Sequence, residues 1–211
     1  VEGVSGVLGV IALYRRDKDS FTSDHLRILL ALAPRIGISI ENALKYREME
    51  EKANTDFVTG LPNSLLMMKS LEAELSTAKR DKHSLAIAVS QVAGLSSLRG
   101  KLGLRDADEL LRSVAHSMRD SCRGYDLVAR IGEDKFALIL PGMRREDLGG
   151  KIAALRAIMA DACRRFGGRG SVRFNVGEAL YPDDADSAKL LLEIAERRTE
   201  QHVSTETESL L

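Results

Sequence analysis

The residues best suited to chemistry lie close together, between positions 123 and 136. Arg123 and Asp126 are separated by two residues, and six positions later a short charged turn begins, with the order Gly132, Glu133, Asp134, Lys135, Phe136. A guanidinium donates paired hydrogen bonds to a phosphate or to the edge of a base, and a carboxylate accepts them from N–H groups. A turn glycine lets the backbone approach a phosphate closely. The segment therefore combines groups that recognise phosphates and bases.

These residues also have simpler structural interpretations. Arg123 could cap the C-terminus of a preceding helix, and Asp126 could cap or bridge locally. An ion pair with Glu133 or Asp134 is the simplest role for Lys135. Both interpretations stay open at the level of sequence.

Composition limits the class of protein. The 211 residues are 44% hydrophobic and 29% charged, which is typical of a soluble globular chain. Basic and acidic residues both number 31, so no overall field favours nucleic acid or insertion into an anionic membrane. The two cysteines form no metal or disulfide pattern, and we expect a cytoplasmic protein. Because Val1 begins in the middle of an apolar pattern, we expect a piece of a longer chain.

The elements that must position these residues follow from periodicity. An apolar segment over 1–14 predicts a buried strand or hairpin arm. A helix with Ser23 or Asp24 as its N-cap is expected to run to about Lys52, distorted at Pro34. Beyond it, the pattern predicts helices at 64–80, 104–120, 145–165 and 186–201, and strands at 84–92, 126–131, 135–141 and 171–180.

The N-terminal part resembles the end of a GAF sensor domain, through its last strands, its Phe21-Thr22 helix start and Ile40-Glu41-Asn42-Ala43. The implied organisation is a GAF remnant at 1–46, a signalling or linker helix at 47–54, a second domain at 55–202 and a flexible tail at 203–211. The helical seam Leu29, Ala33, Ile36, Ile40 and Ala43 predicts a homodimer through this helix. With most of the GAF sheet missing, no GAF ligand site is expected.

The second domain resembles the GGDEF family, which joins two GTP into cyclic di-GMP. Three stretches carry the resemblance: Thr55 to Asn63, the 123–136 segment, and Asn175 to Pro182. The resemblance implies the nucleotidyl cyclase fold, a ferredoxin-like α/β (α+β) sandwich whose mainly antiparallel sheet is surrounded by helices. It also implies a bacterial signalling protein with a protein partner.

The positions that perform catalysis in the family are altered here. By that alignment Gln91 replaces a metal-binding Asp, Arg99 replaces a guanine-reading Asn, and Lys135 replaces the essential Glu of the turn. Asp108 remains as a residual guanine contact, and Asp134 as a metal ligand only if activity survives. We therefore expect no cofactor, with Mg²⁺ required only if the chain is an active cyclase.

The family's product-binding pair is retained as Arg123 and Asp126. The resemblance implies that they bind cyclic di-GMP, with Arg156 as a supporting guanidinium. The sequence thus predicts a catalytically impaired GGDEF domain that acts as a cyclic di-GMP receptor or as a regulatory or dimerisation module. The alternatives are a diguanylate cyclase with residual activity, a module that binds no nucleotide, and a domain that binds GTP without turnover.

Overall fold

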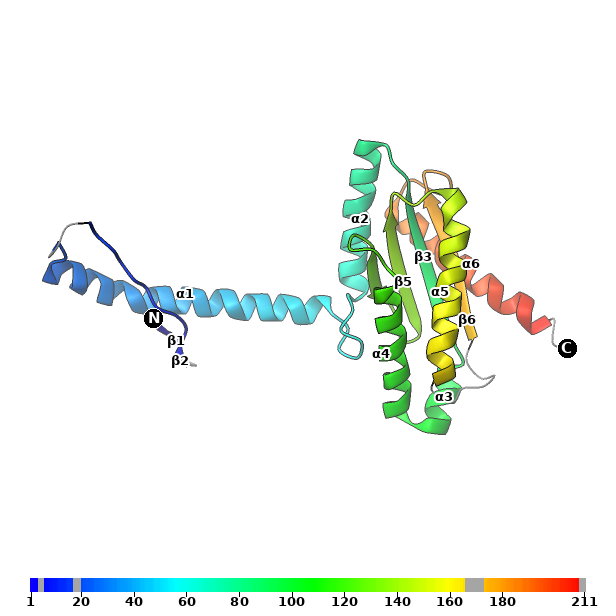
Figure 1. The fold of residues 1–211 in the computed structure, drawn as a ribbon, viewed down its shortest axis with the longest axis horizontal. Helices are drawn as coiled ribbons and strands as arrows, with labels where there is room; N and C mark the ends of the chain where they lie inside the picture. The colour runs from blue at the N-terminus through cyan, green and yellow to red at the C-terminus, as the bar shows by residue number, and fades with distance from the viewer. Residues whose placement is uncertain (4–5, 17–19, 166–172, 209–211) are drawn as a thin grey trace. The chain divides into compact units, whose positions relative to one another are not determined.

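The computed structural model describes residues 1–3, 6–16, 20–165 and 173–208. The chain divides into two compact units, Val1–Ala53 and Asn54–Leu211. Figure 1 shows the elements of both units.

The first unit is a small hairpin followed by one long helix. Strands β1 (Glu2–Gly3) and β2 (Gly6–Val7) pair antiparallel, and helix α1 spans Ser23–Asn54. The residue that caps α1 is Thr22, one position before the predicted caps, because its hydroxyl accepts from the backbone N–H of His25 at 3.4 Å. The helix continues through Pro34 without a break, although a distortion is predicted there.

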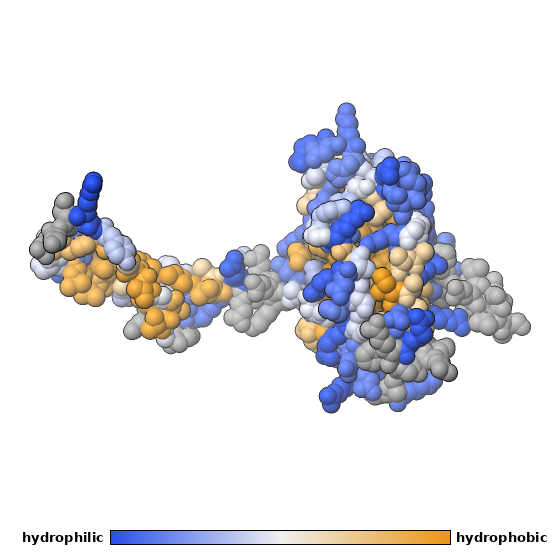
Figure 2. Space-filling model, in the orientation of Figure 1, coloured by the Kyte–Doolittle hydropathy of each residue, from blue (hydrophilic) through white to orange (hydrophobic). Residues whose placement is uncertain are grey.

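The burial predicted over residues 1–14 is wrong for residues 10–14, which are exposed. Val10 and Tyr14 are 88% and 89% exposed. The described residues of this unit form two strands of two residues each and one helix. Elements this small offer the apolar side chains of residues 10–14 too little surface to pack against. Figure 2 shows apolar side chains along much of α1.

The second unit is built from four strands and five helices in its described parts. Their bounds are α2 (Ser64–Asp81), β3 (Leu85–Ala93), α3 (Leu95–Leu102), α4 (Leu104–Asp120), β4 (Leu127–Arg130), β5 (Lys135–Pro141), α5 (Arg145–Arg165), β6 (Arg173–Tyr181) and α6 (Ala188–Glu208).

The four strands form one antiparallel sheet in the order β4-β5-β3-β6, covered by helices on both faces (Figure 1). Helices α3, α4 and α5 pack on one face around Phe136 and Leu138, while α2 and α6 pack on the other around Ile87 and Ile139. The order confirms the predicted cyclase-type, ferredoxin-like α+β fold.

Most predicted bounds agree to within two residues, and three differences stand out. Helix α3 is not predicted; it lies between Gly94 and Gly103, both with positive φ. Helix α6 continues to Glu208, so the tail predicted from 203 starts inside a helix, and 209–211 lie outside the described residues. Residues 171 and 172, the first two of the strand predicted at 171–180, also lie outside the described residues.

The segment that leads into the second unit is fixed by side-chain bonds. Asp56 accepts from the backbone N–H of Thr59 at 2.8 Å and from its hydroxyl at 2.7 Å, so Asp56 anchors the turn at Gly60. Asn63 then caps α2, since its side-chain oxygen accepts from two backbone N–H groups.

Candidate functional site

Asp126 fixes the shape of the loop at residues 121–126, between α4 and β4. Its Oδ2 accepts from the backbone N–H of Arg123 at 2.9 Å, and its own N–H donates to the Arg123 carbonyl at 3.0 Å. Nζ of Lys151 on α5 lies 3.7 Å from the same Oδ2, and the Asp126 side chain is 3% exposed. The carboxylate therefore closes the turn through Oδ2, while Oδ1 takes part in neither contact.

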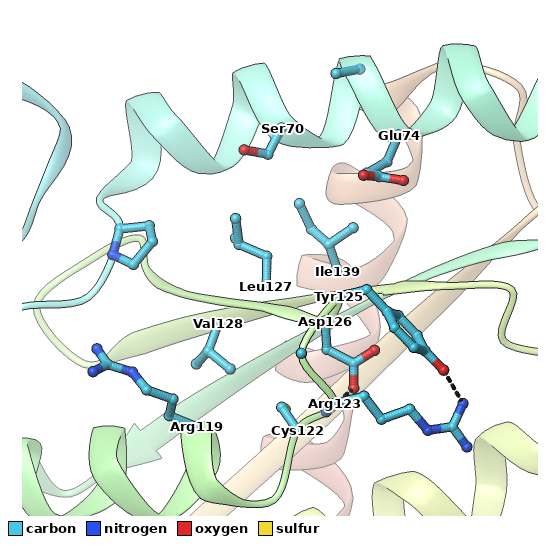
Figure 3. Close-up of a pocket in the computed structure, with 13 residues that line it drawn as sticks. Ser70, Glu74, Arg119, Cys122, Arg123, Tyr125, Asp126, Leu127, Val128 and Ile139 are labelled. Atoms are coloured by element: carbon cyan, nitrogen blue, oxygen red, sulfur yellow. Dashed lines mark hydrogen bonds between the residues drawn. The ribbon is translucent and has the colours of Figure 1, made fainter.

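The Arg123 guanidinium lies against Tyr125 at the surface of this loop (Figure 3). Its Nη1 donates to the Tyr125 hydroxyl at 2.8 Å, and its Cζ lies 5.8 Å from the ring centroid. The hydrogen bond to Tyr125 raises the pKa of the guanidinium further. The end of α4 is instead closed by Ser121, whose hydroxyl donates to the Met118 carbonyl at 2.7 Å. Arg123 is thus held at the surface with its charge intact.

A pocket of about 600 Å³ lies beside the 121–126 loop. It is bounded by α2, the last turn of α4, the loop and β4, and Figure 3 shows Ser70 and Glu74 directed from α2 towards the loop. Arg119, Arg123 and Asp126 line it. Its volume lies within the range of about 300–1,000 Å³ that small-molecule sites occupy.

Arg156, expected to support Arg123, does not line this pocket. Its Nη2 donates to the Val176 carbonyl on β6 at 3.2 Å, so in this structure it connects α5 to the sheet. The lysine that reaches the loop from α5 is Lys151, which also donates to the Ser121 carbonyl at 2.9 Å.

Two side chains, one from β3 and one from α3, hold the charged turn between β4 and β5. Nε2 of Gln91, at the end of β3, donates to Oδ2 of Asp134 at 2.9 Å. Nη1 of Arg99, on α3, lies 3.3 Å from Oε2 of Glu133. Both acidic groups of the turn therefore have partners, Asp134 in an amide and Glu133 in a guanidinium.

Lys135 has a different partner from the one expected. Its Nζ lies 3.4 Å from Oε1 of Glu200 on α6, so the predicted ion pair with Glu133 or Asp134 is wrong. Lys135 is directly opposite Gln91 in the β3–β5 ladder, and its side chain lies on the sheet face that α6 covers. The next residue, Phe136, points to the other face and is fully buried.

A buried ion pair fixes the hairpin to the start of the unit. Nη1 of Arg130 lies 3.0 Å from both oxygens of Asp56, and Nη2 donates to the Glu133 carbonyl at 2.7 Å. The side chain of Arg130 is 6% exposed and that of Asp56 is 15% exposed. Burial raises the pKa of Asp56, but hydrogen bonds from Thr59 and Arg130 outweigh it, so the pKa is lowered overall.

Metal ligands are not gathered in the parts of the chain that the structure describes: no three His, Cys, Asp or Glu side chains there group closely enough to bind an ion. Asp108 is half-buried in the second turn of α4. At the hairpin, Gln91 turns its amide N–H rather than its carbonyl oxygen towards Asp134, and Lys135 adds a positive charge, so this arrangement does not present the set of oxygen donors that Mg²⁺ takes. Separately, no described helix is both long and apolar enough to cross a membrane.

Sequence reasoning missed four lining residues or supports: Glu74, Arg119, Tyr125 and Lys151. Arg119 and Tyr125 are close to Arg123 in the chain, so a wider window around that residue would have found them. Glu74 and Lys151 reach the loop only through the packing of α2 and α5, for which the sequence contains no local signal.

Comparisons with known proteins agree with this fold. The family described as "Diguanylate cyclase, GGDEF domain" matches residues 53–208. The chain is 27% identical over 164 residues to diguanylate cyclase DgcP of Pseudomonas aeruginosa, a match covering 76% of this chain and 24% of DgcP. The chain therefore spans about a quarter of that relative's length.

Solved structures support the assignment. The GGDEF domain of TpbB from Pseudomonas aeruginosa superposes with a TM-score of 0.60 at 26% identity, over 69% of this chain and 86% of that one. The GGDEF domain of DgcB from Caulobacter crescentus, solved in complex with c-di-GMP, has a TM-score of 0.64 at 18% identity, over 72% and 89% of the two chains. With the family match covering most of its length, this chain belongs to the GGDEF family of diguanylate cyclase domains.

Proposed function

We propose that the second unit is a catalytically impaired GGDEF domain that binds cyclic di-GMP and works as a receptor or regulatory module in bacterial signalling. The observation that carries the loss of catalysis is the occupied hairpin. Asp134 and Glu133 are bonded to Gln91 and Arg99, and Lys135 places a cation at the position of the family's essential carboxylate. At a separation of a few ångströms and an effective dielectric near 20, this charge repels a divalent ion by several kcal/mol.

Binding is supported by the pocket beside the 121–126 loop. The pocket has the size of a small-ligand site, and two guanidinium groups, Arg119 and Arg123, line it. The GGDEF domain of DgcB, which shares this fold, was solved in complex with c-di-GMP.

Calorimetry tests the binding directly. Cyclic di-GMP titrated into the wild-type chain should give a saturable heat, and Arg123→Ala should weaken the affinity by tenfold or more because a charge-assisted contact is lost. Arg80→Ala removes an exposed arginine that lies outside the pocket and serves as the matched control. Identical traces without heat for wild type and Arg123→Ala would favour a module that binds no nucleotide.

The alternative is a diguanylate cyclase with residual activity. The observation that favours it is the family itself, since DgcP is named as a diguanylate cyclase and Asp134 and Asp108 are still present here. Under this alternative Asp134 would be a ligand of Mg²⁺. Binding of GTP without turnover is the intermediate case, which calorimetry with GTP in place of cyclic di-GMP identifies.

We further propose that the first unit forms a homodimer through α1 and passes a signal to a protein partner in the cytoplasm. Of the predicted seam on α1, Leu29, Ala33 and Ile36 are half-exposed and Ile40 and Ala43 are exposed, which is apolar surface that a second helix would cover. The GAF remnant at 1–46 remains part of this proposal. Sedimentation of the wild type and of Ile40→Glu tests it: a dimer that becomes monomeric is expected, and a wild-type monomer at about tens of micromolar contradicts it.

A further inference from the structure

The pocket beside the 121–126 loop contains a carboxylate with no evident structural task. Glu74 is half-buried on α2 and points towards Tyr125 and Asp126 (Figure 3). Neither of its oxygens has a hydrogen-bond or ion-pair partner among the described residues. Such a group is free to accept from a ligand.

A guanine base needs two acceptors side by side. Its edge presents the N1–H and the 2-amino group as neighbouring donors, and a carboxylate with both oxygens free can pair with both. Asp126 cannot provide this pair, since its Oδ2 is already bonded to the backbone of Arg123 and faces Lys151, and its side chain is 3% exposed. Glu74 can provide it.

The charges around the pocket agree with this division of roles. The charge of Asp126 is offset by Lys151 at 3.7 Å, so Glu74 is the uncompensated carboxylate of the lining. Arg119 and Arg123 contribute two positive charges from the end of α4 and the loop. A ligand with two phosphates and a base edge rich in donors matches two cations and one anion.

We propose that Glu74 is the guanine-reading residue of this pocket. Its two oxygens accept from the N1–H and the 2-amino group of one guanine, and Arg119 and Arg123 face the phosphates. The inference rests on the proposed binding of cyclic di-GMP and adds the residue that sets base specificity.

The test compares two ligands on three proteins by calorimetry with the full chain. The ligands are cyclic di-GMP and cyclic di-inosine monophosphate, whose bases keep N1–H but lack the 2-amino group. Wild type should prefer cyclic di-GMP by about tenfold. Glu74→Gln should bind cyclic di-GMP about 10- to 100-fold more weakly and should lose most of the preference. Glu72→Gln, an exposed neighbour on α2 outside the pocket, should behave as wild type.

The outcomes separate this inference from the function on which it rests. If wild type binds cyclic di-GMP and Glu74→Gln keeps both the affinity and the preference, the role of Glu74 is contradicted while the receptor function stands. If wild type binds no cyclic di-GMP, the proposed function fails, and the inference fails with it. If circular dichroism shows that Glu74→Gln does not fold, the affinities of the wild type for the two ligands are compared instead. Equal affinities would contradict the inference, because a residue that accepts from the 2-amino group must favour cyclic di-GMP.

Discussion

Each charged side chain of the turn at 132–135 is engaged by a residue from another element. Gln91 comes from β3, Arg99 from α3 and Glu200 from α6. Binding of a divalent ion requires concentrated negative charge, whereas the charged groups of this turn are paired with neighbouring side chains. A divalent ion would have to break such bonds before it met a carboxylate. The proposed loss of catalysis therefore has two sources among single residues: the carboxylates of the turn are already paired, and a lysine stands at position 135.

The strongest single-residue prediction concerns Arg130. Arg130→Ala leaves Asp56 buried without its partner and releases the Glu133 carbonyl, so the free energy of unfolding should fall by about 3–5 kcal/mol. Urea unfolding followed by circular dichroism measures the change. Arg80→Ala, at the exposed pair with Asp81, is the control and should leave the midpoint where it is. A midpoint unchanged in Arg130→Ala would show that the buried pair contributes nothing.

At the scale of elements, the contact of α6 with β6 leaves no room for a side chain at Gly177. A Cβ built there would collide with the carbonyl oxygen of Ala195 and with the backbone of Arg198 and Thr199. The Thr199 hydroxyl also donates to the Val89 carbonyl of β3 at 3.0 Å. This close approach places Glu200 next to Lys135, so the position of the helix decides the partner of the substituted turn residue.

Gly177→Ala is therefore expected to destabilise the second unit by about 1–3 kcal/mol or more, since backbone atoms must move to admit the methyl group. Gly149→Ala is the matched control on α5, where a Cβ would meet nothing within 4 Å. That change should stabilise the unit by about 0.5–1 kcal/mol because alanine is the better helix former. Thermal unfolding of both variants checks the prediction, and the same sign for both would contradict it.

The sequence predicts helices and strands best where their hydrophobic pattern is strong. A continuous apolar run locates β5 at Lys135–Pro141, and the helical pattern locates α5 at Arg145–Arg165, both as predicted. The prediction failed for α3, whose eight residues are too few to show a period, and for residues 10–14, whose apolar pattern does not reveal that little covers them. It could not find Glu74, because only the packing of α2 beside the loop brings that residue to the pocket.

At the scale of the molecule, two acidic residues make the stability of the second unit depend on pH. Hydrogen bonds from Arg198 and from the Leu180 backbone lower the pKa of Asp184, and those from Thr59 and Arg130 lower that of Asp56 despite its burial. Both carboxylates are more acidic in the folded chain than at their usual value of 3.8. Their stabilisation is thus complete well above pH 3.8 and is lost as the pH falls through the lowered folded values.

The expected result is a urea midpoint that is constant near neutral pH and falls steeply as the pH drops towards and below 3.8. Asp184→Asn should lower the midpoint at pH 7 and make the acid dependence shallower, because one of the two titrating groups is gone. Asp183→Asn is the exposed neighbour for comparison. If wild type and Asp184→Asn show parallel curves, Asp184 does not contribute in the way described.

We propose that this domain binds a cyclic dinucleotide but does not make one. The most direct measurement is the amount of cyclic di-GMP formed when the purified chain is incubated with GTP and either Mg²⁺ or Mn²⁺, with an active GGDEF protein assayed in parallel. The account predicts no product above that of a sample without protein. Steady formation of cyclic di-GMP that increases with protein concentration and stops in Asp134→Asn would contradict it.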